Sequence, residues 1–220
     1  MSADDWTPIE SRYTSIVRRS FPSFELNTFV LDGMTTLESR DRIGEAVSKN
    51  PDITVYAFGV NDALPRGLTR NGRGSMIRFS YRVGMSKKFR HIYRTCFLNP
   101  LEYVMQILAG PKHYFSIPET ISHIDTCINE LQKSGSKIIL INIAPVQNYR
   151  FIHAQSHIVR YNCAIQEYCA KQDIPVVDAF SILNGIGLDN ALAIDKFHYS
   201  EAAHKEVAAE LTKIIDKLKG

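Results

Sequence analysis

An aspartate and a histidine with the spacing of a catalytic pair stand just before the last predicted helix. Asp195 and His198 lie three positions apart in the loop Asp-Lys-Phe-His. A carboxylate placed there can fold back onto the imidazole within one turn, fix its tautomer and stabilise the imidazolium that forms during proton transfer. The same pattern also suits a surface loop followed by a helix cap, so it does not by itself identify a catalytic site.

Two further groups could serve the same chemistry from the ends of predicted strands. Asn61 lies in Gly-Val-Asn-Asp, residues 59–62, directly after the apolar segment 53–58. Its side-chain amide can donate a hydrogen bond to a developing oxyanion, and the backbone N–H of Gly33 can do the same. Each residue also suits an ordinary turn, because Asn, Asp and Gly favour turns for local backbone reasons.

The elements that must position these groups alternate between strands and helices. Apolar, β-prone segments predict strands at 25–31, 53–58, 137–144 and 174–177. Helical spacing and capping signals predict helices from Pro8 to Phe21 and at 36–49, 81–93, 100–108, 119–133, 153–171 and 201–217. At the first helix, Thr7 is expected to be the cap and Glu10 to complete a capping box. Ser200 is expected to cap the last helix.

This order predicts an α/β fold, a three-layer α/β/α sandwich around a central parallel sheet with right-handed crossovers. In such folds the site lies at the carboxyl ends of the strands, which is where Gly33 and Asn61 fall. The chain of 220 residues suits a single domain spanning 1–220. No apolar run is long enough to cross a membrane, and residues 1–6 do not form a signal peptide, so a cytoplasmic location is expected.

A strongly basic stretch interrupts this order. Between Ala63 and Leu101 there is no Asp or Glu but nine Lys and Arg residues, which leaves the rest of the chain at about −6 against a total of +3. The stretch is either a solvated lid or an insertion at about 63–118 that attracts an anionic substrate, such as an acidic sugar, a phosphorylated intermediate or an acyl carrier. Nucleic acid is not an expected partner, because no recognised binding motif is present.

The histidines and cysteines do not predict a metal site. His153 and His157 have i, i+4 spacing on a predicted helix, but neither a carboxylate nor a third ligand lies near them in the sequence. The four cysteines form no CxxC pair and are expected to be reduced thiols.

The combination of these blocks resembles the SGNH (GDSL-like) hydrolase family. Gly33 in Leu-Asp-Gly-Met-Thr-Thr looks like the glycine block, Asn61 in Gly-Val-Asn-Asp matches the asparagine block, and Asp195 to His198 matches the C-terminal DxxH block. The resemblance implies an SGNH or flavodoxin-like sheet and serine esterase chemistry without metal or cofactor. It implies His198 as general base and acid, Asp195 as its orienting group, and Gly33 and Asn61 as oxyanion donors.

One block of that family is absent. No Gly-Asp-Ser occurs in the sequence, and in the family this block ends a first, central strand shortly before the first helix. We therefore expect the first strand and its serine to be missing, on a segment that would precede Met1. Ser2 is the only serine near the expected position and has no strand before it, so the nucleophile is left unassigned.

Two functions follow from these observations. The first is an esterase acting on acyl esters of small molecules or carbohydrates, including an O-deacetylase or O-acyltransferase of surface-polysaccharide metabolism, because residues 61–66 are similar to family members associated with such genes. The second is a catalytically inactive module that binds a glycan or another protein, because the serine block is absent.

Overall fold

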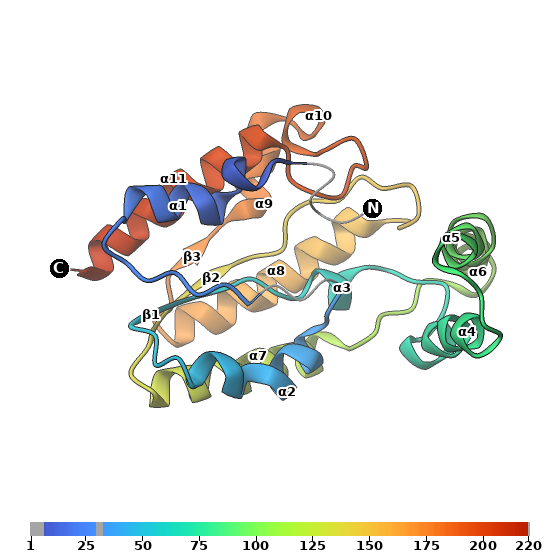
Figure 1. The fold of residues 1–220 in the computed structure, drawn as a ribbon, viewed down its shortest axis with the longest axis horizontal. Coiled ribbons are helices and arrows are strands. Elements are labelled where there is room, and N and C mark those ends of the chain that lie inside the picture. Colours follow the sequence, from blue (N-terminus) through green and yellow to red (C-terminus); the bar gives the residue numbers. More distant parts are fainter. Residues whose placement is uncertain (1–6, 30–32, 220) are drawn as a thin grey trace.

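The computed structural model describes residues 7–29 and 33–219, and within them it contains a parallel sheet of three strands, shown in Figure 1. The strands are β1 (Ile53–Tyr56), β2 (Lys137–Ile141) and β3 (Val176–Val177), in the order β1-β2-β3. Val55 is in register with Ile139, and Leu140 with Val176. The α/β class and the parallel sheet expected from the sequence are confirmed.

Helices cover both faces of the sheet (Figure 1). One face carries α1 (Tyr13–Ser20), α9 (Ala179–Ile186), α10 (Leu188–Ala191) and α11 (Glu201–Lys219), and the other carries α2 (Thr36–Val47), α3 (Val60–Ala63), α7 (Ile117–Lys133) and α8 (Ala154–Lys171). A further group lies to one side of the sheet and consists of α4 (Arg70–Arg82), α5 (Lys87–Ile92), the π-helical turn η3 (Tyr93–Leu98) and α6 (Asn99–Ala109).

Every residue of the central strand β2 except the first is apolar and buried. Ile138 and Leu140 pack into the core shared with α7 and α8, whereas Ile139 and Ile141 pack into the core shared with α9 and α11. Successive side chains of a strand point to opposite faces. A parallel strand covered on both sides must therefore be apolar throughout.

The predicted start of the first helix is wrong. Thr7 does not cap it: its hydroxyl donates to the carbonyl of Tyr199, 2.9 Å away and 192 positions along the chain. A short 3-10 turn, η2 (Ile9–Ser11), follows instead, and α1 begins only at Tyr13. The Thr7 hydroxyl, which the local sequence predicts to form a capping box with Glu10, thus binds the C-terminal part of the chain instead.

The strand predicted at 25–31 does not form over Glu25–Phe29, and its remaining residues lie outside the described ranges. A β-prone segment becomes a strand only when a neighbour supplies ladder hydrogen bonds. Within the described chain, β1 pairs only with β2, so no ladder reaches residues 25–29.

The helix predicted at 81–93 is also wrong in its bounds, because α4 ends at Arg82 and α5 begins at Lys87. The helices predicted at 36–49, 100–108, 119–133, 153–171 and 201–217 are confirmed within two residues at each end. Ser200 caps α11, since its hydroxyl oxygen accepts from Ala203 N at 3.3 Å. No helix in the described ranges is long and apolar enough to cross a bilayer.

Candidate functional site

The structure brings Asp195 and His198 into direct contact. His198 Nδ1 lies 2.6 Å from Asp195 Oδ2, and Asp195 Oδ1 accepts hydrogen bonds from the backbone N–H groups of Phe197 and His198, each at 3.0 Å. Lys196 adopts a left-handed conformation, φ 55°, that closes the turn between them. Two backbone N–H groups therefore hold the Asp195 carboxylate in the orientation in which it binds the imidazole.

The environment of Asp195 decides which nitrogen of His198 carries the proton. Partial burial alone would raise the Asp195 pKa, but the hydrogen bonds from the His198 backbone and ring, and from Phe197, outweigh it and hold the pKa below its ordinary value. An ionised carboxylate can only accept hydrogen bonds. His198 Nδ1 is therefore the donor, and Nε2 is left as the basic nitrogen of a side chain that is 44% exposed.

The loop after β2 holds the Asp195–His198 loop in place. Asn148 Nδ2 donates to the carbonyl of Asp195 at 2.9 Å, and the backbone N–H of Gln147 donates to the carbonyl of Lys196 at the same distance. Both anchors come from the loop that follows β2, so this loop holds the pair in position.

The glycine and asparagine predicted as oxyanion donors also lie on neighbouring segments. Asn61 Nδ2 donates to the carbonyl of Met34, the residue after Gly33, at 3.0 Å. Next to it, Asp62 Oδ1 and Oδ2 accept from Thr36 Oγ1 and N at 2.6 and 3.1 Å. The loop that begins at Gly33 is thus bound to the loop after β1 by two adjacent side chains.

Asp62 is fully buried, with no exposed surface. Burial raises its pKa to about 6, although the hydrogen bonds from Thr36 oppose that shift. Asp62 is therefore a structural carboxyl that ties α2 to α3. Asn61 Nδ2 carries two amide hydrogens, and one of them is not used in the hydrogen bond to Met34.

Sequence reasoning missed Arg66, which it placed in the basic lid. Arg66 is buried, 6% exposed, and its Nη2 donates to Asn61 Oδ1 at 3.0 Å. Its guanidinium lies over the rings of Phe151 and Tyr114, at 4.8 and 5.1 Å. Burial lowers its pKa to about 10, so it remains a cation at neutral pH.

The same ring system leads from Asn61 to the histidine. Phe151, under Arg66, lies 6.0 Å from the ring of Phe197, which meets the His198 ring edge-on at 5.0 Å. Asn61 and His198 therefore border one continuous packed cluster. The local sequence, Pro-Arg-Gly at 65–67, favours a turn and does not mark the arginine as buried.

Glu102 fixes the segment that follows Arg66. It is 3% exposed, and it pairs with Arg73 and, at 3.9 Å, with Arg150. Gly67 packs so tightly against it that an added Cβ would meet the Glu102 carbonyl oxygen at 2.0 Å. Arg66 and Arg73 thus face inward, and neither belongs to a solvated lid.

A groove runs beside the Asp195–His198 loop. Its lining includes Gln147, Asn148, Tyr149, Phe151, Gln155 and Lys196. Amides, an exposed aromatic ring and an ammonium group together can bind a ligand rich in hydroxyl groups.

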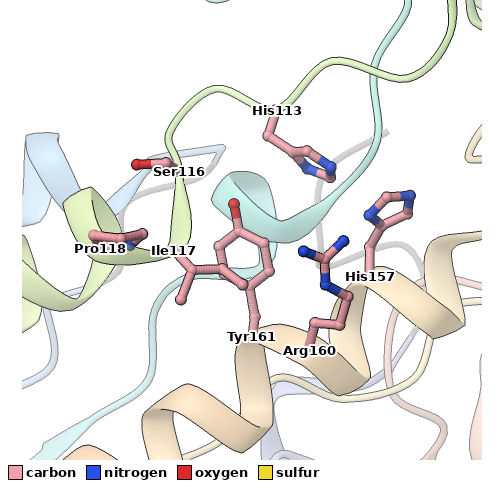
Figure 2. Close-up of a pocket in the computed structure, with 7 residues that line it drawn as sticks. All are labelled: His113, Ser116, Ile117, Pro118, His157, Arg160 and Tyr161. Carbon is pink, nitrogen blue, oxygen red and sulfur yellow. The ribbon is translucent and has the colours of Figure 1, made fainter.

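A second pocket lies between the start of α7 and α8 and is lined by His113, Ser116, Arg160 and Tyr161 among others (Figure 2). Its hydroxyl groups have structural roles: Ser116 caps α7 with Glu119, and Tyr161 donates to Phe115 O at 2.5 Å. None of the site residues predicted from the sequence lines this pocket. Across residues 7–29 and 33–219 no group of three or more His, Cys, Asp or Glu side chains could hold a metal ion.

A parallel α/β domain with a histidine–aspartate pair at the carboxyl ends of its strands is typical of hydrolytic enzymes that activate a hydroxyl nucleophile. The sequence matches the GDSL-like lipase/acylhydrolase family over residues 4–206, and the chain belongs to that family. Ser2, the nucleophile considered from the sequence, lies outside the described residues.

Solved structures share the fold at low sequence identity. A catalytic mutant of Axe2, an acetylxylan esterase from Geobacillus stearothermophilus, aligns with TM-score 0.61 and 16% identity over 93% of this chain and 80% of that one. TesA aligns with TM-score 0.58 and 13% identity over 95% and 89%. A lipolytic G-D-S-L family protein from Veillonella parvula aligns with TM-score 0.60 and 14% identity over 96% and 90%. A comparison with curated protein sequences gave no significant match.

Proposed function

We propose that the protein is an ester hydrolase that removes O-acyl groups from a carbohydrate. The observation that carries the proposal is the Asp195–His198 pair, whose 2.6 Å hydrogen bond leaves Nε2 as a base at the carboxyl ends of the strands. Family membership supports ester chemistry, and the acetylxylan esterase fold neighbour together with the groove of amides and Tyr149 supports a carbohydrate substrate.

In this proposal His198 Nε2 removes the proton from the hydroxyl of the nucleophilic serine expected from the family, which is not assigned to any residue of this sequence. The serine oxygen attacks the ester carbonyl as that proton leaves. The resulting imidazolium is stabilised by Asp195. The oxyanion accepts hydrogen bonds from the Gly33 N–H and from the second amide hydrogen of Asn61, whose carbonyl oxygen is held by Arg66. The ester C–O bond then breaks, and Nε2 returns the proton to the departing sugar alkoxide.

Deacylation uses the same groups in reverse order. Water, or a second alcohol, gives a proton to Nε2 and attacks the acyl-enzyme, and the serine oxygen leaves with that proton. Hydrolysis and acyl transfer share the acyl-enzyme and differ only in the acceptor. The groove beside Lys196 is the place where a sugar acceptor would bind.

The test is hydrolysis of p-nitrophenyl acetate and release of acetate from an acetylated xylo-oligosaccharide, by a form of the protein that includes a Gly-Asp-Ser block. We expect His198→Ala to lower kcat at least about a thousandfold, because the base and acid are lost together. His91→Ala, an exposed histidine on α5, is the matched control and should retain full activity. Equal turnover by wild type and His198→Ala would refute the mechanism.

A serine-directed fluorophosphonate probe separates this proposal from the inactive binding module. Labelling of the wild type that fails in His198→Ala supports the esterase. Binding of an acetylated oligosaccharide by a protein that neither labels nor hydrolyses it supports the module instead.

A further inference from the structure

Helix α6 packs on the protein through a face that carries two buried polar residues, and it presents a second, apolar face to solvent. Glu102 and Gln106 are 3% and 4% exposed, and Gln106 donates to the carbonyl of Arg150 at 2.8 Å while accepting from Ile152 N at 3.2 Å. Amphipathic helices of globular proteins usually bury their apolar face and expose their polar face. In α6 two polar residues are buried and the apolar side is exposed, so the apolar side is not part of the hydrophobic core.

The outward face is formed by the pairs of apolar residues that directly follow each of those two polar anchors. Tyr103, Val104, Ile107 and Leu108 are 38%, 45%, 60% and 76% exposed, and their i, i+1, i+4, i+5 spacing places them on one side of a helix. Phe97, 53% exposed, lies just before α6 on η3, which continues into α6 without a break. The face is therefore a continuous apolar stripe over about three turns.

The segment that contains this stripe, residues 63–118, carries exposed cations and no exposed carboxylate. From Ala63 to Pro118 the sequence holds one acidic residue, Glu102, and it is buried. Arg82, Lys88 and Arg94 are exposed, on α4, α5 and η3. The helices that bear them lie to one side of the sheet, away from α1 and α11 (Figure 1).

We propose that α6 and the exposed cations of α4, α5 and η3 form a docking surface for an anionic lipid bilayer. A helix with an apolar face flanked by Lys and Arg residues binds in the bilayer interface by burying that face and attracting acidic headgroups. The charge pattern disfavours a second copy of the chain as the occupant of this face, because a symmetric contact would bring two like-charged surfaces together. This inference does not depend on the ester chemistry proposed above.

The experiment is co-sedimentation of the purified protein with vesicles of phosphatidylcholine, alone or mixed with phosphatidylglycerol. We expect binding at least about tenfold tighter to the anionic vesicles. We also expect that binding to weaken as salt rises from about 0.1 M to about 1 M, where the Debye length falls from about 10 Å to about 3 Å. Equal binding to both kinds of vesicle, or to neither, would overturn the proposal.

Two variants separate the apolar and the electrostatic parts. Ile107→Ser with Leu108→Ser should weaken binding at least about tenfold and leave its salt dependence in place. Arg82→Gln, Lys88→Gln and Arg94→Gln together should weaken it on the order of a hundredfold, about fivefold for each cation, and remove the salt dependence. All five side chains are already exposed, so the variants should fold, as circular dichroism and Tm will show.

Matched controls lie elsewhere on the molecule. Ile9→Ser removes an isoleucine that is 61% exposed, against 60% for Ile107, and should bind vesicles like the wild type. Neutralising Lys171, Lys213 and Lys217 with glutamine removes three exposed cations on α8 and α11 and should also have no effect. Equal losses in control and test variants would show non-specific attraction and overturn the proposal.

Two further readouts distinguish other occupants of the face. If the protein forms a dimer that Ile107→Ser with Leu108→Ser dissociates, and it does not bind vesicles, the face is a dimer interface and the proposal fails. His198→Ala must bind vesicles as tightly as the wild type, since binding that disappears with that variant would mean that the lipid is recognised as a substrate.

Discussion

Arg66 donates a hydrogen bond from Nη2 to the side-chain carbonyl oxygen of Asn61 at 3.0 Å, from a position that is 94% buried. Asn61 Nδ2 donates to Met34 O from the other end of the same amide. The amide is thus held at both ends, with the cation polarising its carbonyl. A polarised amide with a fixed orientation is a better donor to an oxyanion than a freely rotating one.

Arg66→Met removes this partner and keeps most of the apolar volume of the side chain. We expect kcat for p-nitrophenyl acetate to fall about 10- to 100-fold with little change in KM, because a hydrogen bond to a charged group contributes about 1.5–3 kcal/mol. Arg82→Met, at an exposed arginine of the same segment, is the control. If Asn61→Ala lowers kcat and Arg66→Met does not, Arg66 has no positioning role.

Asp195→Asn tests the tautomer of His198. The asparagine Oδ1 can still accept the two backbone N–H groups, but its Nδ2 would face His198 Nδ1 and favour the tautomer that protonates Nε2. We expect kcat to fall by about three to four orders of magnitude with the fold intact. Asp216→Asn, at an exposed aspartate of α11, should be silent in the same steady-state assay.

Asp62 should make stability fall with rising pH. Its pKa is raised from 3.8 to about 6 in the folded protein, so its contribution is fully present below about pH 4 and is lost as pH rises through 6. The shift corresponds to about 3 kcal/mol. Asp62→Asn should remove this contribution, so that between pH 4 and pH 7 the free energy of unfolding rises more with pH, or falls less, than in the wild type, which urea unfolding will measure. An unchanged slope would mean that the carboxyl is ionised throughout.

His204 should act in the opposite direction over the same range. Its Nδ1 accepts from Tyr13 N at 3.3 Å and its ring stacks on that of Tyr13, and burial lowers its pKa from 6.5 to about 4. Its contribution to stability is therefore present above pH 6.5 and is lost as pH falls through 4, by about 3 kcal/mol. His204→Gln should leave a protein whose stability decreases between pH 4 and pH 6.5, as the Asp62 effect predicts once it is no longer opposed.

Two glycines should respond to alanine with opposite signs. At Gly67 a Cβ would meet Glu102 O at 2.0 Å and Met105 Cβ at 2.8 Å, so Gly67→Ala should cost at least about 1–3 kcal/mol of unfolding free energy. Gly44 lies inside α2 with nothing within 4 Å of an added Cβ, so Gly44→Ala should stabilise by about 0.5–1 kcal/mol. Thermal unfolding of both variants is the measurement, and a stabilised Gly67→Ala would contradict the packing at Glu102.

Features that depend on near neighbours in the chain could be read from the sequence. The apolar run of β2 required a covered parallel strand, and the long helices followed from their periodicity and caps. Asp195 and His198 meet because three residues span one turn, so their contact needed no knowledge of the fold.

Contacts between distant segments were decided only by the tertiary structure. The Thr7 hydroxyl binds Tyr199 rather than the first turn of its own helix, and Arg66 turns inward onto Asn61 although the charge pattern around it is that of a solvated lid. Residues 25–29 are β-prone and still form no strand, because ladder hydrogen bonds come from a neighbour and not from the segment itself. Local sequence sets which conformations a segment prefers, but the partners that bury and hydrogen-bond its side chains select among them, and those partners lie far away in the chain.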